Sequence, residues 1–261
     1  MIYYLFLAVA LVISYIFMMG SSAKTFAKEL IFGKPAKHSP LYTVGGLFCA
    51  VLVITKIWYS FANIIHANPT VPNFSDNVPF WEVAFGYAQA SVWEEIVSRL
   101  LLIGVSLLWI DLIFRRNKLQ TPYRYFIGGK LNFGPVECGL IVFSALMFGF
   151  AHLEIWDFWK VPPAFIVGLA FGYLFVRFGI YAAIMLHFSL NFLSIPIDYF
   201  NPSLGVEFII ALMIWACLAA GVMFLIYYSL RLWKFITQSV AQKKIDATQG
   251  PGQFGPTGTN Q

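Results

Sequence analysis

Long apolar runs, separated by polar or glycine-containing turns, account for most of the chain. A helix needs roughly 20 apolar residues to cross the hydrocarbon core of a bilayer. Seven runs approach or exceed that length: Ile2–Gly20, Leu41–Ile65, Phe80–Phe114, Val136–His152, Pro162–Phe178, Ile180–Phe200 and Val206–Trp233. The pattern therefore predicts an all-α fold, a polytopic membrane helix bundle with about seven transmembrane helices.

The third run, Phe80–Phe114, is too long for one straight span. We expect its first turns, from Phe80 to about Ala90, to lie in the membrane interface as a separate amphipathic helix, which would bring the number of helices to eight. Residues 1–235 then form a single membrane-embedded domain. Residues 236–261 are polar and end in a Gly/Pro/Thr-rich stretch that buries little apolar surface, so they predict a disordered cytoplasmic tail.

Composition agrees with a lipid environment. Of the 261 residues, 59% are hydrophobic and only 11% are charged, which excludes a water-soluble domain and makes the lipid bilayer the main partner. The three cysteines, Cys49, Cys138 and Cys217, lie in apolar runs and form no C-x-x-C pair, so they are interpreted as small core residues.

The basic residues predict the orientation in the membrane, because cytoplasmic loops carry an excess of Lys and Arg. Fourteen of the 17 basic residues follow the first, third, fifth and seventh runs, and Lys56, Arg99 and Lys160 do not. This distribution predicts an N-terminus outside and a cytoplasmic C-terminus. It also accounts for the net charge of +5, so that charge does not indicate nucleic-acid binding, for which the chain contains no motif.

The third run contains charged residues at membrane depth, where they persist only next to partners, water or substrate. Glu95 and Arg99 are four residues apart and share a helix face, so they can form an ion pair. Glu94 lies about 140° around the helix from Arg99. We expect Glu95 to neutralise Arg99 and Glu94 to face a reactant as a general base. The alternative is that both glutamates only satisfy Arg99 and a neighbouring helix.

Two further groups of polar residues follow on later helices. His152 ends the fourth run, where an imidazole can exchange protons at physiological pH. His187 and Asn191, four residues apart on the sixth run, share a face that Ser194 continues. These side chains can hold an oxyanion or a water, although for the pair in isolation interhelical hydrogen bonding is the favoured explanation. Together, the groups provide what amide hydrolysis requires.

The motifs Glu94-Glu95-x-x-x-Arg99, Phe148-x-x-x-His152 and His187-x-x-x-Asn191 resemble, in this order, the three motifs of the CAAX protease and bacteriocin-processing (CPBP, Abi) intramembrane protease family. Type II CAAX prenyl proteases belong to that family. The resemblance covers roughly residues 93–200. It implies an intramembrane endopeptidase that acts on a membrane protein or a lipidated peptide substrate.

The resemblance also implies roles for single residues. Glu94 and His152 match the family's catalytic pair, which activates a water for attack on the peptide carbonyl. His187 and Asn191 match the proposed oxyanion hole, and Glu95 and Arg99 match supporting positions. Local spacing does not decide between a metal-dependent and a metal-free mechanism, although neither H-E-x-x-H nor a cysteine ligand set is present. The glutamate-type mechanism, without a cofactor, is favoured here. The alternative is zinc held by Glu94, His152 and His187.

Three alternatives to this reading stay open. With the predicted orientation the site faces the outer leaflet, whereas prenylated CAAX proteins are processed on the cytoplasmic side. The substrate is therefore either a CAAX prenyl protein, with part of the topology inverted, or an exported one. A non-enzymatic immunity or scaffolding protein would use the polar residues to hold its helices together. A proton-coupled transporter is disfavoured because no inverted repeat is evident.

Overall fold

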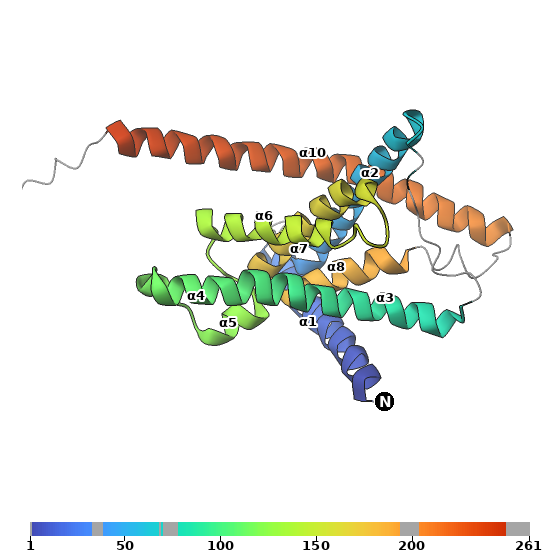
Figure 1. The fold of residues 1–261 in the computed structure, drawn as a ribbon, viewed down its shortest axis with the longest axis horizontal. Coiled ribbons are helices and arrows are strands. Elements are labelled where there is room, and N and C mark those ends of the chain that lie inside the picture. The colour runs from blue at the N-terminus through green and yellow to red at the C-terminus, as the bar shows by residue number, and fades with distance from the viewer. Residues whose placement is uncertain (1, 33–38, 68, 70–77, 194–203, 249–261) are drawn as a thin grey trace, which may run out of the picture.

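The computed structural model describes residues 2–32, 39–67, 69, 78–193 and 204–248 (Figure 1). All regular structure among these residues is helical, which confirms the predicted all-α fold. In chain order the elements are α1 (Ile2–Phe32), α2 (Pro40–Ile64), α3 (Phe80–Glu95), the π-helix η1 (Ile96–Val105), α4 (Ser106–Ile113), η2 (Arg116–Lys118), α5 (Pro122–Ile127), α6 (Pro135–Phe150), η3 (Phe158–Lys160), α7 (Val161–Arg177), α8 (Ile180–Phe192) and α10 (Leu204–Thr248).

The helices match the seven apolar runs. Among the described residues, five helical stretches are long and apolar enough to cross a membrane: Ile2–Thr25, Pro40–Ile64, Phe80–Ile113, Phe158–Arg177 and Gly205–Lys234. Two shorter apolar helices, Pro135–Phe150 and Ile180–Phe192, complete the set. The chain is therefore an integral membrane protein built as a polytopic helical bundle.

The prediction that Phe80 to Ala90 form a helix separate from the rest of the third run is wrong. α3 begins at Phe80 and continues through η1 into α4, so that α3 and α4 lie in one line in Figure 1. The first turns of α3 have a protein surface to pack on, because Phe85 stacks against the ring of Tyr4 in α1 at 4.4 Å. Val92, farther along α3, is buried with Leu7 of α1 and Ile184 of α8. These contacts with α1 and α8 hold the whole of α3 in the bundle.

The C-terminal helix also extends farther than the polarity of the sequence suggests. The predicted disordered tail begins at residue 236, whereas α10 continues to Thr248. Residues 236–248 contain neither Gly nor Pro, the residues that most strongly disfavour a helix. The next such residue is Gly250, just beyond the end of α10. Residues 249–261 lie outside the described part of the chain.

Close packing of α6 on α7 positions the end of α6 that carries the candidate site. A Cβ atom at Gly168 would lie 3.0 Å from Ala145 Cα, and one at Gly172 would lie 2.9 Å from a methyl carbon of Ile141. The Gly168-x-x-x-Gly172 spacing is thus used for packing within the chain. A Cβ atom at Gly149 would lie 3.1 Å from the carbonyl oxygen of Val161, so the end of α6 approaches the start of α7 closely.

Candidate active site

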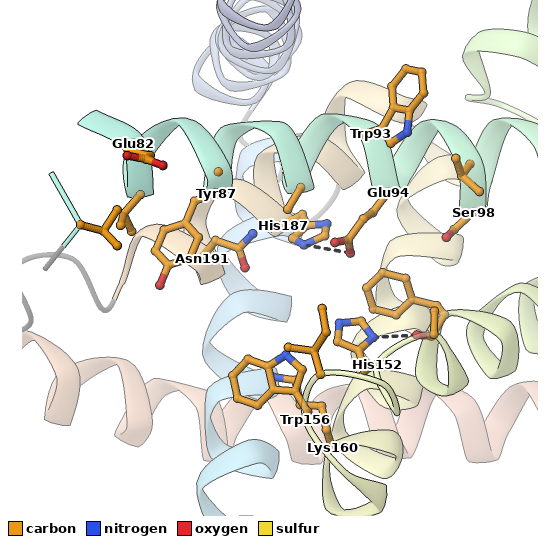
Figure 2. Close-up of a pocket in the computed structure, with 18 residues that line it drawn as sticks. Glu82, Tyr87, Trp93, Glu94, Ser98, His152, Trp156, Lys160, His187 and Asn191 are labelled. Atoms are coloured by element: carbon orange, nitrogen blue, oxygen red, sulfur yellow. Dashed lines mark hydrogen bonds and ion pairs between the residues drawn. The ribbon is translucent and has the colours of Figure 1, made fainter. Parts of the chain in front are cut away.

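A cavity of about 590 Å³ lies between α3, α8 and the turn that follows α6. Glu94, His152, His187 and Asn191 all line it, although they come from three separate segments of the chain. Figure 2 shows Glu94 and His187 on one side of this cavity and His152 on the other. The fold therefore brings together the four residues predicted as catalytic.

Glu95 faces away from the cavity and into the protein. Its side chain and that of Arg99 are completely buried, and Glu95 Oε2 accepts a hydrogen bond from Arg99 Nε at 3.1 Å, which confirms the predicted ion pair. The other carboxylate oxygen, Oε1, lies 2.9 Å from Nδ1 of His187 on α8. Glu95 thus connects the buried Arg99 with the imidazole of His187, a second contact that the helix geometry of α3 alone does not reveal.

Arg99 has further partners that make its burial tolerable. Its Nη1 donates to the hydroxyl of Ser144 on α6, and that hydroxyl donates to the carbonyl oxygen of Ser98. The guanidinium carbon lies 5.2 Å from the ring centre of Phe148 and 5.6 Å from that of Phe171. A buried charge is stable only when it is paired and hydrogen-bonded, and Arg99 meets both conditions through three helices.

Glu94 has the opposite environment to its neighbour. Its side chain is 39% exposed, against 0% for Glu95, and it points into the cavity (Figure 2). Glu94 Oε2 lies 3.8 Å from Nε2 of His187, which is longer than a hydrogen bond. A carboxylate that borders a cavity in this way can accept a proton from a bound water.

His152 lies in the turn that follows α6, where its ring is held in one orientation. Its Nδ1 is 2.8 Å from the carbonyl oxygen of Phe148. A carbonyl oxygen only accepts, so Nδ1 carries the hydrogen and Nε2 of the neutral ring has the lone pair. Burial lowers the pKa of His152 below the usual value for histidine, more than the Phe148 carbonyl raises it. His152 is therefore suited to accept a proton through Nε2.

His187 and Asn191 lie one turn apart on α8, as predicted from their spacing. The His187 ring stacks on Phe171 at 4.8 Å with an interplanar angle of 19°, and its Nδ1 contacts Glu95. The Asn191 amide nitrogen donates to the hydroxyl of Ser91 at 3.2 Å, which in turn donates to the carbonyl oxygen of Tyr87. α3 thus fixes both side chains at the cavity wall. Ser194, predicted to continue this stripe, lies outside the described residues.

Lys160 and Trp156 also line the cavity and were not predicted as site residues. The sequence did contain a signal for Lys160, since it is one of three basic residues that do not follow the predicted cytoplasmic ends of the helices. Trp156 carries no comparable signal, because an aromatic residue near a helix end is common in membrane proteins.

A second polar cluster lies away from the cavity and joins α4, α5 and α6. Arg115 donates to Asp111 at 2.7 Å and to Glu137 at 2.8 Å, and the hydroxyl of Tyr125 donates to Asp111. Asp111 and Glu137 are buried. This cluster holds the end of α4 against the start of α6, and it has no access to the candidate site.

Zinc held by Glu94, His152 and His187 is the alternative to the glutamate-type mechanism. All three side chains line the cavity, but no three His, Cys, Asp or Glu side chains within the described ranges lie close enough together in this geometry to form a candidate metal-binding group. Nδ1 of His187 contacts Glu95 and Nδ1 of His152 contacts the Phe148 carbonyl, so each ring keeps Nε2 for a proton or a ligand, as histidines that bind metal also do. The glutamate-type mechanism stays a prediction.

Comparison with known proteins gives a match at the level of a family. The family model described as "Type II CAAX prenyl endopeptidase Rce1-like" matches residues 76–193, a segment that contains the cavity and all the predicted site residues. Neither the curated proteins nor the solved structures gave a significant match.

Proposed function

We propose that this chain is an intramembrane endopeptidase in which Glu94 and His152 activate the water that hydrolyses a peptide bond. The match of residues 76–193 to the type II CAAX prenyl endopeptidase family model supports the proposal. The substrate would be a membrane-anchored or lipidated protein. One observation supports the proposal above all. Of two adjacent glutamates, Glu95 is completely buried against Arg99, and Glu94 alone reaches the cavity that His152 also lines.

In the proposed mechanism, a water lies between Glu94 and His152. Glu94 takes a proton from the water, assisted by the lone pair at His152 Nε2, and the water oxygen bonds to the carbonyl carbon of the substrate. The carbonyl oxygen becomes an oxyanion. The tetrahedral intermediate then loses its amine as the carbon–nitrogen bond breaks, and the proton first taken from the water passes to the leaving nitrogen.

Asn191 and His187 are proposed to stabilise the oxyanion, and the geometry sets a condition on His187. Because Nδ1 of His187 contacts the carboxylate of Glu95, Nδ1 carries a hydrogen. Nε2 then donates a hydrogen bond only when the ring is doubly protonated. The amide of Asn191 donates in any protonation state. We therefore propose Asn191 as the constant donor, with His187 contributing as an imidazolium.

The test of this function uses Glu94→Gln, which preserves the side-chain shape, and His152→Asn, which removes the imidazole but keeps an N–H donor. Loss of a general base lowers the rate by about 10²- to 10⁴-fold. We expect that loss in kcat for both variants, with unchanged membrane levels and melting temperature. Glu207→Gln and His66→Asn, which change exposed residues that do not line the cavity, serve as matched controls. Full activity in both site variants would exclude the proposed mechanism.

The substrate can be identified in the same experiment. Mass spectrometry of peptides released from membranes should detect products with the wild-type protein that are absent with Glu94→Gln. A prenylated CAAX protein is the first candidate, because the matching family model carries that activity in its description. A non-enzymatic immunity or scaffolding role predicts instead that Glu94→Gln retains its biological effect and that the two peptide profiles are the same.

A further inference from the structure

Lys160 places a positive charge in the same cavity as the proposed catalytic pair. It is the last residue of η3 and directly precedes α7. Figure 2 shows it next to Trp156, on the side of His152 away from Glu94. Lysines near the ends of membrane helices usually extend their ammonium groups into water. Lys160 instead lines a cavity whose walls are mostly apolar, so its position calls for a different explanation.

Among the residues that the structure describes, the ammonium group of Lys160 contacts an aromatic ring and forms an ion pair with no carboxylate. Its Nζ lies 3.8 Å from the centre of the Trp156 ring, in cation–π geometry. None of the ion pairs found among the described residues includes Lys160. Glu94 attracts it electrostatically without pairing with it. The cavity thus contains a cation whose charge is left for a ligand to neutralise.

The backbone around Lys160 is anchored, so the position of the charge is defined. The Asp157 carboxylate accepts a hydrogen bond from the backbone N–H of Trp159 at 2.8 Å, which caps η3. Trp58 of α2 donates from its ring nitrogen to the carbonyl oxygen of Trp159 at 2.7 Å, and the two rings lie 5.7 Å apart. α2 therefore holds the residue next to Lys160 in place before a ligand binds.

We propose that Lys160 binds a carboxylate of the peptide substrate and thereby determines which peptide bond reaches Glu94 and His152. The inference rests on the proposed function, because it assigns a role in substrate selection at the same site. Glu94 repels a second carboxylate, whereas Lys160 attracts it. A substrate with one carboxylate is thus held with that group beside Trp156, and the bond to be cleaved lies toward Glu94. Lys160 acts in this scheme as a specificity-determining residue and takes no part in the proton transfers.

The test uses the purified full-length protein and a library of hydrophobic, lipid-anchored peptides in matched pairs, which differ only in a free or an amidated C-terminus. Hydrogen bonds to charged groups contribute about 1.5–3 kcal/mol, which corresponds to a ten- to hundredfold preference in kcat/KM for the free acid. We expect Lys160→Met to abolish this preference and Lys160→Arg to retain it. Lys56→Met, which removes an exposed lysine of α2, should leave the preference unchanged.

A second set of amidated peptides, with Glu or Gln near the C-terminus, distinguishes a terminal carboxylate from a side-chain carboxylate as the bound group. A preference for Glu over Gln that Lys160→Met removes would identify the side chain as the bound group.

If the wild-type protein cleaves acid, amide, Glu and Gln peptides equally well, the role of Lys160 is refuted and the proposed function stands. If Lys160→Met retains the wild-type preference, the role is also refuted. If the wild-type protein cleaves no member of the library, both proposals fail. If Lys160→Met folds poorly, the preference of the wild-type protein for a carboxylate and its retention in Lys160→Arg still test the role of Lys160.

Discussion

Glu95 offers the sharpest test of how this site is built, because its two carboxylate oxygens contact different partners. Oε2 lies 3.1 Å from Arg99 Nε, and Oε1 lies 2.9 Å from His187 Nδ1. Glu95→Gln keeps the shape and an acceptor oxygen but removes the charge. Because Glu95 and Arg99 are both completely buried, the variant leaves a guanidinium without its counter-charge. Breaking a buried ion pair in this way costs about 3–5 kcal/mol.

Removing the second charge should restore most of that stability. In Glu95→Gln/Arg99→Met no buried charge remains, and replacing a buried pair by apolar groups is often neutral. Arg99 also bonds to Ser144 and lies over Phe148, contacts that the double variant loses. We therefore expect its stability to lie within about 2 kcal/mol of wild type.

A second double variant, Glu95→Met/Arg99→Met, distinguishes the two roles of Glu95, which are the ion pair with Arg99 and the contact with His187. It is equally free of buried charge, but methionine provides no acceptor for Nδ1 of His187. The two double variants should therefore unfold at similar temperatures. Because a displacement of about 1 Å in a catalytic group can cost up to 10²-fold in rate, we expect the methionine variant to have a kcat roughly ten- to a hundredfold below that of its glutamine counterpart.

Stability is measured as the unfolding transition of purified protein in detergent, followed by tryptophan fluorescence, and kcat is measured per folded molecule. The reasoning about charge is refuted if Glu95→Gln unfolds within about 1 kcal/mol of wild type, or if adding Arg99→Met to it gives no recovery. The reasoning about His187 is refuted if the two double variants have the same kcat.

Three further predictions concern protons, metal and orientation. Burial lowers the pKa of His152, so NMR titration of labelled histidines should give it a midpoint below the usual value of about 6.5, and a higher midpoint would contradict neutral His152 as a base near pH 7. The glutamate-type mechanism predicts that dialysis against EDTA leaves kcat unchanged, whereas a loss that added zinc restores would support the metal alternative. The predicted orientation places Ala67 outside, so a membrane-impermeant thiol reagent should label Ala67→Cys in intact cells. If Ala67→Cys is labelled only from the cytoplasmic side, the predicted topology is inverted.

The local part of the site could be predicted from the sequence because it depends on helix geometry. The spacing of Glu94, Glu95 and Arg99 determines which carboxylate can reach the guanidinium, and the ion pair forms as expected even though Arg99 lies in a π-helical segment. The order of the helices follows from the apolar runs in the same way. Both inferences need only residues that are close in the chain.

The long-range contacts could not be predicted. The Glu95–His187 contact joins residues 92 positions apart, and Arg99–Ser144 joins residues 45 positions apart, so each depends on how helices pack. Lys160 enters the cavity because α6 and α7 approach closely at Gly149, a feature of tertiary packing. The continuity of α3 with η1 was not predicted for the same reason, since the first turns of α3 pack on α1.

The short length of α6 has a consequence for the membrane itself. Its 16 residues rise about 24 Å, less than the roughly 30 Å of an average hydrocarbon core. Thinning of the bilayer around α6, with water filling the remaining difference, is one way to relieve this hydrophobic mismatch. His152 follows the last turn of α6 directly, so the difference in length lies beside a proposed catalytic residue, where hydrolysis needs water. Turnover should accordingly depend on the acyl-chain length of the surrounding lipids, with thick bilayers slowing the reaction by limiting access of water.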